Sequence, residues 1–282
     1  METHQVRGGD GLRLHVREWG GAESPPILFI HGWSQNHMCW QRQVDSALAD
    51  EFRLVALDLR GHGMSDTPLE AEHYTNARLW ADDIAAVIEQ LGLKKPVLVG
   101  WSYGGIIMCD YMRAYGQDRI AGVNFLDAAV TLDAAALGKL LVGPGFLEPF
   151  QGATADDLPT NIEAMRRFVR ACLAKPLPAD IHEQALCWNI VVPAKVRLAL
   201  VQREVRSDDV LSTLAVPVLV THGELDTVVL PAMAEHVLAT CPKAEASWFA
   251  GVAHAPHLED PARYNRELAE FARRAHGQAK PS

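Results

Sequence analysis

The chain lacks the charge and the long hydrophobic runs of a protein that binds nucleic acid or lipid. Its 282 residues include 26 Lys and Arg against 35 Asp and Glu, and the formal net charge is −9. The basic residues form no block, which argues against nucleic acid and anionic membrane surfaces as partners. No apolar run approaches the ~18 residues that span a bilayer. We therefore expect neither nucleic acid nor membrane as a partner.

Cysteine is scarce and irregularly placed. The sequence has five cysteines, an odd number, and none lies at the C-x-x-C spacing of metal sites. The first residues, "METHQVRGGDGLRLHV", lack the charged-then-apolar layout of a signal peptide. We expect a cytoplasmic protein whose cysteines are reduced core thiols. They are Cys39, Cys109, Cys172, Cys187 and Cys241.

Short, continuous apolar runs recur along the chain, and each ends in Gly, Asp, His or Ser. The runs are "PPILFIHG", "FRLVALDLRGHG", "KPVLVGWS", "AGVNFLDAA" and "VPVLVTHGELD". Runs of this kind are typical of strands buried on both faces of a parallel sheet. Near the start, "LRLHVR" at 12–17 alternates apolar and polar residues, which favours a half-exposed antiparallel strand.

Helical patterns separate the apolar runs. One of them places Trp80, Ile84, Val87, Ile88 and Leu91 on one face, with Asp82, Asp83 and Glu89 opposite. Strands that alternate with helices predict an α/β fold with a doubly wound, mostly parallel sheet. In such a sheet the functional residues gather on the loops at the carboxyl ends of the strands.

The strand pattern stops between residues 129 and 212. This stretch contains an amphipathic helical pattern through Leu158, Ile162, Met165, Val169 and Cys172, and prolines divide it into short pieces. We expect a sheet core formed by 1–128 and 213–282. The helical insertion 129–212, between two strands, would then form a lid over the carboxyl edge of the sheet.

The stretch "VLVGWSYGGI" places Ser102 between Gly100 and Gly104, after an apolar run and before a helical pattern. The G-x-S-x-G turn needs residues without bulk two positions away on each side. The helix start directs backbone N–H groups and a positive dipole end toward charge that develops near the serine. A helix N-cap is the simpler alternative. The strand–turn–helix context favours a nucleophile.

A serine hydroxyl needs a base, and the base needs a carboxylate that orients it. His254 in "GVAHAPHLEDP" is the candidate base, and His257 is its competitor. Asp226, at the end of "VLVTHGELD", is the candidate acid, with Asp127 in "VNFLDAAV" as the alternative. The order Ser102, Asp226, His254 is the Ser…Asp…His order of α/β-hydrolases.

An oxyanion hole requires two backbone donors. The N–H of Tyr103 directly follows the candidate nucleophile, and we expect the second donor to be the N–H of Trp33 in "HGW". His31-Gly32 allows that loop to bend back over the sheet, and we interpret His31 as a structural hydrogen-bonding residue.

The motifs "HGW", "DLRGHGMSD", "GWSYGG", "HGELD" and "GVAHAPHLEDP" together resemble the α/β-hydrolase superfamily over nearly the whole chain. In detail the chain is similar to the group of small esterases, enol-lactonases and cofactor-free haloperoxidases (perhydrolases). Related dehalogenases and epoxide hydrolases have aspartate at the position of Ser102, so the resemblance excludes both activities.

The sequence contains no metal-binding spacing, because His254 and His257 lack the H-E-x-x-H frame. It also contains no phosphate-cradling loop and no dinucleotide fingerprint. We therefore expect no metal and no cofactor. Asp58, Arg60 and His62 of "DLRGHGMSD" are interpreted as structural residues of a supporting turn.

These features predict a serine hydrolase that acts on small-molecule carboxylic esters or lactones through an acyl-enzyme. The alternatives are a carbon–carbon bond hydrolase or cofactor-free oxygenase on the same fold, and a ligand-binding receptor without turnover. The fold by itself does not determine the substrate. The expected apolar pocket residues are Trp101, Leu140, Leu141, Phe146, Phe150, Trp188 and Val192.

Overall fold

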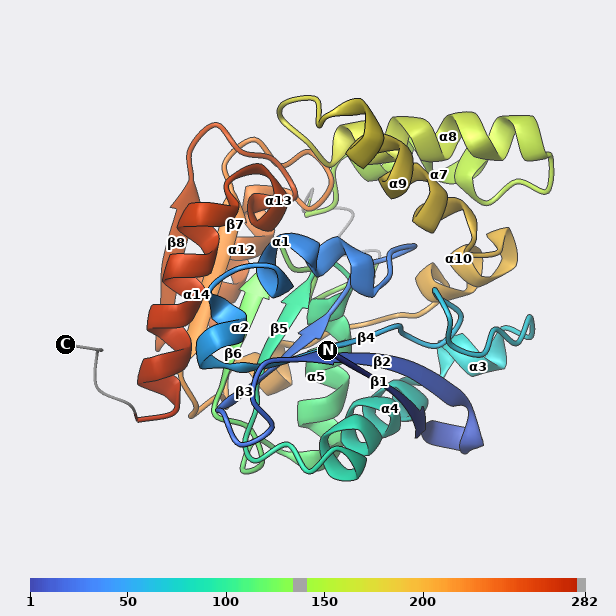
Figure 1. Ribbon diagram of the computed structural model, residues 1–282. Helices are drawn as coiled ribbons and strands as arrows, with labels where there is room; N and C mark the ends of the chain where they lie inside the picture. Colours follow the sequence, from blue (N-terminus) through green and yellow to red (C-terminus); the bar gives the residue numbers. More distant parts are fainter. Residues whose placement is uncertain (134–140, 278–282) are drawn as a thin grey trace.

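The computed structural model describes residues 1–133 and 141–277 and is built around one eight-stranded sheet (Figure 1). The strands are β1 (Glu2–Arg7), β2 (Arg13–Trp19), β3 (Pro26–Ile30), β4 (Arg53–Leu57), β5 (Val97–Trp101), β6 (Gly122–Leu126), β7 (Val218–Gly223) and β8 (Ala244–Phe249). Their spatial order is β1-β2-β4-β3-β5-β6-β7-β8. The β1–β2 and β2–β4 pairs are antiparallel, and every other pair is parallel. The expected mostly parallel sheet is confirmed.

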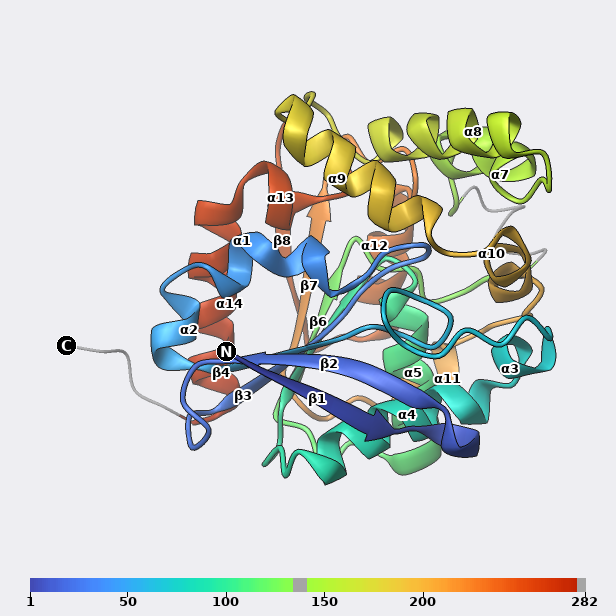
Figure 2. The ribbon, with the colours of Figure 1, turned by 45° about the vertical axis from the view of Figure 1, so that its right-hand side comes forward.

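Helices cover both faces of this sheet (Figure 2). They are η1 (Gly9–Gly11), η2 (His37–Trp40), α1 (Gln41–Val44), α2 (Leu48–Glu51), α3 (Glu72–Thr75), α4 (Ala77–Gln90), α5 (Gly104–Tyr115), α7 (Pro144–Ala153), α8 (Leu158–Ala171), α9 (Ala179–Ile190), α10 (Ala194–Val201), α11 (Asp208–Leu211), α12 (Pro231–Thr240), α13 (Pro256–Glu259) and α14 (Pro261–Ala275). Residues of α4, α5 and α12 belong to one hydrophobic cluster, and residues of α1, α2 and α14 belong to a second.

Strand β3 shows why the central strands are apolar at every position. Successive side chains of a strand point to opposite faces of the sheet. Leu28 and Ile30 therefore pack in the cluster with α4 and α5, whereas Ile27 and Phe29 pack in the cluster with α1, α2 and α14. All five residues of β3 are buried. A run without alternation is the consequence of a sheet that is covered on both faces.

Strand β2 is antiparallel, as the sequence indicates, but it is not half-exposed. It pairs with β1 on one side and with β4 on the other. Leu14, His15 and Val16 are all buried. The ring of His37, from the loop after β3, lies 5.3 Å from the ring of His15 and helps to cover the face that was expected to be polar and open.

Helix α4 corrects a second expectation. Trp80, Ile84 and Val87 are buried as the pattern predicts, but Asp83, which was assigned to the solvent face, is fully buried. Its carboxylate accepts two hydrogen bonds from the Arg60 guanidinium, at 2.7 and 2.8 Å. A buried acid is tolerated where such a paired, hydrogen-bonded cation compensates its lost hydration. Arg60 is structural, as expected.

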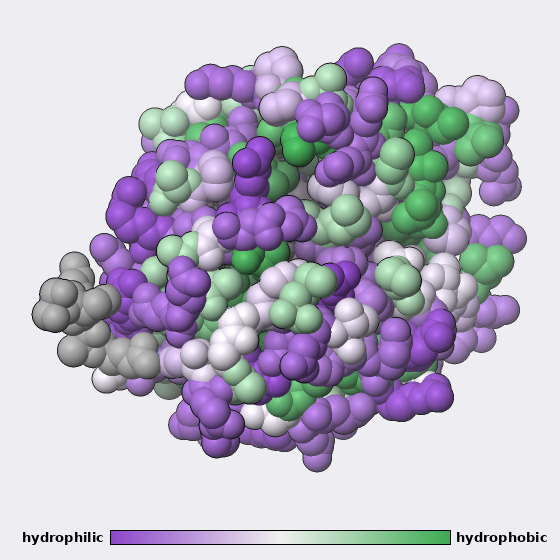
Figure 3. Space-filling view, viewed as in Figure 1, coloured by the Kyte–Doolittle hydropathy of each residue, from purple (hydrophilic) through white to green (hydrophobic). Residues whose placement is uncertain are grey.

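The chain between β6 and β7 forms α7, α8, α9, α10 and α11. In Figures 1 and 2, α7 to α10 lie above the carboxyl ends of the central strands. Figure 3 shows hydrophobic side chains gathered over this part of the surface, whereas much of the rest of that face is hydrophilic. The exposed large hydrophobic side chains here are Leu147, Leu158, Val191 and Leu198.

Two side chains of this region differ from the sequence-based expectation. Leu158 was placed on the buried face of its helix, but it is the first residue of α8 and is exposed, whereas Met165, Val169 and Cys172 are buried. Cys187 is also exposed, because it lies on the outer side of α9. The other four cysteines are buried, and all five are free.

Within the described ranges, no single helix is long and apolar enough to cross a membrane. Among the described helices, α9 and α10 are long and apolar enough for a membrane span only when they are taken together, and they are bent by 77° relative to each other.

Candidate active site

Ser102 lies on a tight turn between β5 and α5. Its φ of 55° is in the left-handed region, which is strained for a residue with a Cβ. A Cβ at Gly100 would lie 2.7 Å from the carbonyl oxygen of Gly104, and a Cβ at Gly104 would overlap the carbonyl oxygen of Ile30. The two glycines are therefore required by close backbone approach. The turn has the geometry that the G-x-S-x-G pattern predicts.

His254 and Asp226 form a buried hydrogen-bonded pair. Asp226 follows β7, and His254 lies between β8 and α13. The Nδ1 of His254 is 2.7 Å from Oδ2 of Asp226. The other oxygen, Oδ1, accepts hydrogen bonds from the backbone N–H groups of Val228 at 2.7 Å and Val229 at 3.1 Å. A proton on Nδ1 satisfies this carboxylate and leaves Nε2 as the basic nitrogen.

Trp101 connects the serine turn to the histidine loop. Its indole Nε1–H donates to the carbonyl oxygen of His254 at 2.7 Å, and the two rings are 5.6 Å apart. Across residues 1–133 and 141–277, no side chain forms a hydrogen bond with the hydroxyl of Ser102. Hydrogen bonds between catalytic groups are often long before substrate binds. The structure thus places the residue before Ser102 in contact with His254, without a hydrogen bond between the Ser102 hydroxyl and the pair.

Asp127, the alternative acid, does not bond to His254. Its Oδ1 accepts a hydrogen bond from the N–H of Gly223 at 2.9 Å, and its Oδ2 is buried without a partner among the described residues. Burial and the neighbouring Asp226 carboxylate raise the pKa of Asp127 well above its usual range. A protonated Asp127 can donate to Asp226, so we interpret the two acids as sharing one negative charge.

His257, the alternative base, has no acid beside it. Its ring packs against Trp40 and Trp101, and neither ring nitrogen has a hydrogen-bond partner among the described residues. Burial, reinforced by the charge of His254, lowers its pKa well below the usual value. A neutral ring held between two indoles has the surroundings of a core residue.

The two candidate oxyanion donors lie on either side of Ser102. Gly32 lies against the serine, since a Cβ there would be 2.8 Å from Ser102 Cβ, and Trp33 follows directly. Within the described chain, the backbone N–H groups of Trp33 and Tyr103 donate no hydrogen bond. His31 holds this loop, with Nδ1 2.9 Å from the Gly32 oxygen and Nε2 accepting from the Leu59 N–H at 3.0 Å. It is a structural residue, as expected.

A small apolar cavity of about 30 Å³ adjoins Ser102. Among the expected pocket residues that the structure describes, one lines this cavity: Phe146, from α7. Trp33, expected as an oxyanion donor, also lines it. The sequence did not indicate the rest of the lining, which comes from loops and from segments far apart in the chain. These residues are Ala129, Leu132, Val142, Val201, Val228 and Val229.

The remaining expected pocket residues lie elsewhere. Trp101 packs behind the serine turn, and the indole Nε1 of Trp188 donates to Oε1 of Gln35 at 2.7 Å. Leu141 and Val192 are buried in the main hydrophobic cluster, where Phe150 packs against it. Their apolar character is explained by packing. Leu140 lies outside the described residues.

Two groups of side chains could hold a metal ion, although the sequence shows no metal-binding spacing. One consists of Asp127, His222 and Asp226, and the other of His15, His37 and Asp58. The first belongs to the candidate active site, because Asp226 is the acid that lies 2.7 Å from Nδ1 of His254. Neither group was visible in the sequence, because its members come from separate segments.

The fold and this site define an α/β hydrolase, and the chain belongs to the alpha/beta hydrolase family, whose model matches residues 27–267. It is 29% identical to the AB hydrolase superfamily protein YisY of Bacillus subtilis over 95% of this chain and 98% of that protein. It is 31% identical to the bifunctional esterase/perhydrolase DCH of Acinetobacter calcoaceticus over 78% of this chain and 81% of that protein. The expected resemblance is confirmed.

Among solved structures, the chain is similar to the crystal structure of the esterase RhEst1 from Rhodococcus sp. ECU1013. The two superpose with a TM-score of 0.91 and 34% sequence identity, covering 96% of this chain and 98% of that chain. The likeness therefore includes the segment between β6 and β7 as well as the sheet.

Proposed function

We propose that the protein is a serine hydrolase that cleaves carboxylic esters or lactones through an acyl-enzyme on Ser102. The enzyme class, carboxylic ester hydrolase, agrees with the names of the relatives and of the structural neighbour. The observation that carries the mechanism is the 2.7 Å hydrogen bond between His254 Nδ1 and Asp226 Oδ2, on a loop that accepts a hydrogen bond from Trp101, the residue before Ser102.

In the first half of the proposed reaction, Nε2 of His254 takes the proton of the Ser102 hydroxyl as Oγ attacks the substrate carbonyl carbon. The negative charge that develops on the carbonyl oxygen is stabilised by the N–H groups of Trp33 and Tyr103. Asp226 orients the imidazole and stabilises the imidazolium. The carbon–oxygen bond to the alcohol then breaks, and His254 transfers its proton to the departing oxygen.

In the second half, water replaces the alcohol. His254 takes a proton from the water, whose oxygen attacks the acyl carbon, and the bond to Ser102 Oγ breaks as Ser102 regains its proton. The product is a carboxylic acid. In a lactone the leaving hydroxyl stays attached to that acid, so the same steps open the ring.

We also propose that the helical segment 129–212 acts as a lid over this site. Its helix α10 accepts hydrogen bonds from both candidate oxyanion residues. The indole of Trp33 donates to the Arg197 oxygen at 3.0 Å, and the Tyr103 hydroxyl donates to the Leu200 oxygen at 2.8 Å. A cavity of about 30 Å³ is far smaller than the ~300 Å³ of ordinary ligand pockets. We therefore expect the cavity to widen by movement of α7 or α10 when a substrate enters.

The apolar lining of the cavity favours an apolar acyl chain or ring. No residue of the lining carries a charged side chain, and the polar side-chain groups of Trp33 and Tyr103 already donate to backbone oxygens of α10. A bifunctional esterase/perhydrolase is among the relatives, so hydrogen peroxide is worth testing as a replacement for water in the second half of the reaction.

The function is tested with a panel of p-nitrophenyl esters and lactones of increasing chain length, together with a fluorophosphonate probe. We expect turnover of apolar esters and one labelled serine, Ser102, which mass spectrometry can map. Ser102→Ala should abolish both, while Ser207→Ala, at another buried serine, should change neither.

Three results contradict the proposal. Labelling of another serine, or ester turnover in Ser102→Ala, would show that Ser102 is not the nucleophile. Turnover of diketones or aromatic rings without any ester hydrolysis would favour the carbon–carbon hydrolase or oxygenase alternative. Binding of esters without turnover would favour the receptor.

A further inference from the structure

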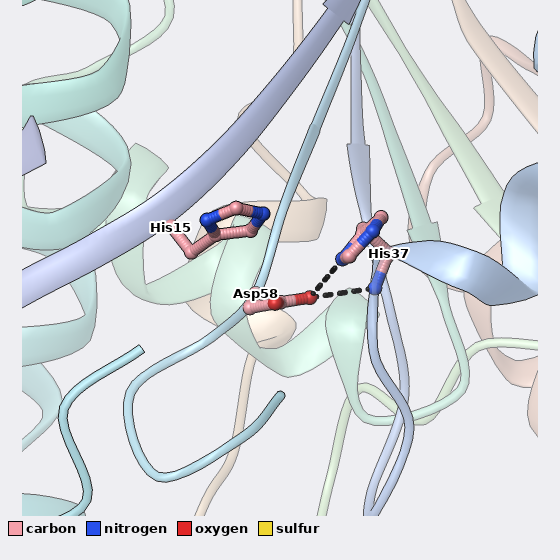
Figure 4. Close-up of side chains that lie close together, drawn as sticks. All are labelled: His15, His37 and Asp58. Atoms are coloured by element: carbon pink, nitrogen blue, oxygen red, sulfur yellow. Dashed lines mark hydrogen bonds and ion pairs between the residues drawn. The ribbon is translucent and has the colours of Figure 1, made fainter. Parts of the chain in front are cut away.

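Three side chains with metal-ligand chemistry meet on the side of the sheet where β2 and β4 pair. His15 lies on β2, His37 is the first residue of η2, and Asp58 directly follows β4. Figure 4 shows them converging from three different segments, with Asp58 between the two rings. One ligand atom from each residue lies within 4.8 Å of the others. None of the three has a part in the ester chemistry proposed above.

Asp58 supplies an ionised carboxylate that is fully buried. Its Oδ1 accepts hydrogen bonds from the backbone N–H and from Nδ1 of His37, both at 2.7 Å, and its Oδ2 accepts from the N–H of Met64 at 2.9 Å. These hydrogen bonds outweigh burial and lower the pKa of Asp58. A carboxylate that stays charged in the interior calls for a cation or several donors as compensation.

His15 supplies an imidazole whose hydrogen bonds are missing. The residue is 3% exposed, and neither Nδ1 nor Nε2 has a partner among the described residues. Both nitrogens therefore remain available, and a neutral imidazole carries the free lone pair that binds a metal. Buried polar atoms without partners are rare in folded proteins and call for an explanation such as an ion or a water molecule.

The backbone fixes His15 and Asp58 relative to each other. The backbone N–H of Asp58 donates to the main-chain carbonyl oxygen of His15 at 2.8 Å. The hydroxyl of Ser65 also joins the two residues. It accepts from the backbone N–H of His15 at 2.9 Å and donates to the main-chain carbonyl oxygen of Asp58 at 2.5 Å. His37 comes from the loop after β3, and its side chain is 11% exposed. The backbones of two ligands are thus fixed relative to each other, and the third ligand lies at the solvent side.

We propose that His15, His37 and Asp58 form a binding site for a divalent transition-metal ion of the Zn²⁺ class. Two imidazoles and one carboxylate are a common ligand set for such ions, with water in the open position. Bonds of about 2.0–2.2 Å place tetrahedral ligand atoms about 3.3–3.5 Å apart. On binding, Nδ1 of His37 exchanges its hydrogen bond to Asp58 for the metal, with its proton moving to Nε2, and the His37–Asp58 contact opens by less than an ångström.

The ion would brace the loop that carries Trp33. His37 lies four residues beyond Trp33 in this loop, while His15 and Asp58 belong to the sheet. Binding ties the loop to β2 and β4. Arg13 and Arg17 flank His15 on β2, and their positive charges oppose a cation, as does the nearby His31 if it becomes protonated. The ligand set rather than the surrounding charge must therefore provide the affinity.

The test is a calorimetric titration of the chelator-treated full chain with Zn²⁺, repeated with Co²⁺ as a spectroscopic probe. The background is Cys187→Ser, because Cys187 is the exposed thiol and thiolates bind both ions. We expect one ion per chain, visible d–d absorption from Co²⁺, and a thermal midpoint that rises by roughly 5 °C at a Zn²⁺ concentration of about 100 times Kd.

His15→Gln and His37→Gln should each weaken Zn²⁺ binding at least about tenfold and remove the thermal shift. The matched control is His236→Gln, since His236 Nε2 lies 2.7 Å from Asp208 Oδ1 in a similar but more exposed pair. This substitution should leave binding unchanged. If His15→Gln does not fold, His37→Gln and the Co²⁺ spectrum of the unsubstituted ligands decide the question.

The proposal is overturned if no stoichiometric binding occurs, because a water molecule then accounts for the unpaired ring of His15. It is also overturned if binding persists in both His15→Gln and His37→Gln, or if it is lost in His236→Gln. The test measures metal binding and thermal stability, so its outcome does not depend on whether Ser102 hydrolyses esters.

Discussion

Asp127 and Asp226 lie side by side behind the candidate base, but only Asp226 accepts a hydrogen bond from the ring of His254. The two acids end neighbouring parallel strands, β6 and β7, so both reach the same edge of the sheet. Their surroundings differ. Asp226 receives three hydrogen bonds, from His254 and two backbone N–H groups, whereas Asp127 receives one, from Gly223. With fewer donors to stabilise its charge, and with burial and the Asp226 carboxylate acting on it, Asp127 has a raised pKa.

The first prediction separates the two acids by substitution. Asp226→Asn should lower kcat by a factor on the order of 10⁴, because the amide favours the wrong tautomer of His254. Asp127→Asn is the matched control at the neighbouring strand end, and it should lower kcat far less, since an amide N–H can replace the proton that Asp127 carries. Steady-state ester hydrolysis measures both. A larger loss in Asp127→Asn would assign the catalytic acid to Asp127.

A second prediction concerns stability and pH. Asp127 has a raised pKa in the folded protein, owing to burial and the Asp226 charge, but an ordinary pKa near about 4 when unfolded. Above that pH the folded state binds one proton more at Asp127 than the unfolded state does. The free energy of unfolding therefore falls by about 1.4 kcal/mol per pH unit as pH rises toward the pKa of Asp127 in the folded protein. Asp127→Asn removes this dependence.

Urea unfolding at several pH values between about 5 and 7 tests this linkage. The free energy of unfolding of Asp127→Asn, relative to the unsubstituted protein, should increase steadily with pH. A difference that does not change with pH would show that Asp127 is ionised in the folded protein.

The fold could be predicted from the sequence because each central strand is a recognisable apolar run. The runs that became β3, β5 and β7 are apolar at nearly every position, and such runs arise only where both faces of a sheet are covered. The predictions for β2 and α4 failed where a polar residue is buried against a segment that is distant in the sequence. Asp83 is paired with Arg60, and periodicity carries no information about contacts between residues 23 positions apart.

The candidate catalytic residues could be predicted because each occupies the end of a strand and has a local motif. Ser102 has its two glycines, Asp226 ends the run "VPVLVTHGELD", and His254 belongs to the motif "GVAHAPHLEDP". The cavity lining could not be predicted in the same way. Val201 and Leu132 reach the cavity through the packing of separate segments, and an apolar residue there looks like any other core residue in sequence.

A third prediction concerns acid sensitivity. Burial lowers the pKa of His31 to about 4 and that of His62 to about 3. Both would have an ordinary pKa near 6.5 when unfolded, so the unfolded state binds more protons below about pH 6.5. Stability that is fully present above this pH is therefore lost as pH falls toward 4, by about 1.4 kcal/mol per unit for each histidine.

Chemical denaturation between about pH 6.5 and pH 4.5 checks the third prediction. His31→Asn and His62→Asn should each reduce the slope of stability against pH by about one proton, whatever their effect on stability at neutral pH. A slope that stays the same in both variants would assign the acid sensitivity to other groups.

The last prediction concerns the proposed lid, where α7 offers two aromatic rings with different surroundings. Phe146 lines the cavity and its ring lies 5.1 Å from that of Trp33. Phe150, one turn further along α7, is 5.5 Å from Phe146 but does not line the cavity. The two residues belong to the same helix and are both half-buried, so they form a matched pair that separates pocket size from the stability of the lid.

Phe146→Ala should therefore shift the preferred ester toward longer acyl chains, because it removes a ring from a cavity of only about 30 Å³ next to Ser102. Phe150→Ala should leave the chain-length preference in place. It should lower thermal stability about as much as Phe146→Ala does, because both rings are half-buried. Truncating a fully buried Phe costs about 3–5 kcal/mol, which sets the upper bound for both variants. The ratio of kcat/KM for long and short p-nitrophenyl esters measures the shift, and fluorophosphonate labelling of Ser102 in both variants shows that the site is intact. An equal shift in the two variants would mean that the lid acts through its mobility, and an unchanged ratio in both would place chain-length selection in the loops around Trp33 and Trp101.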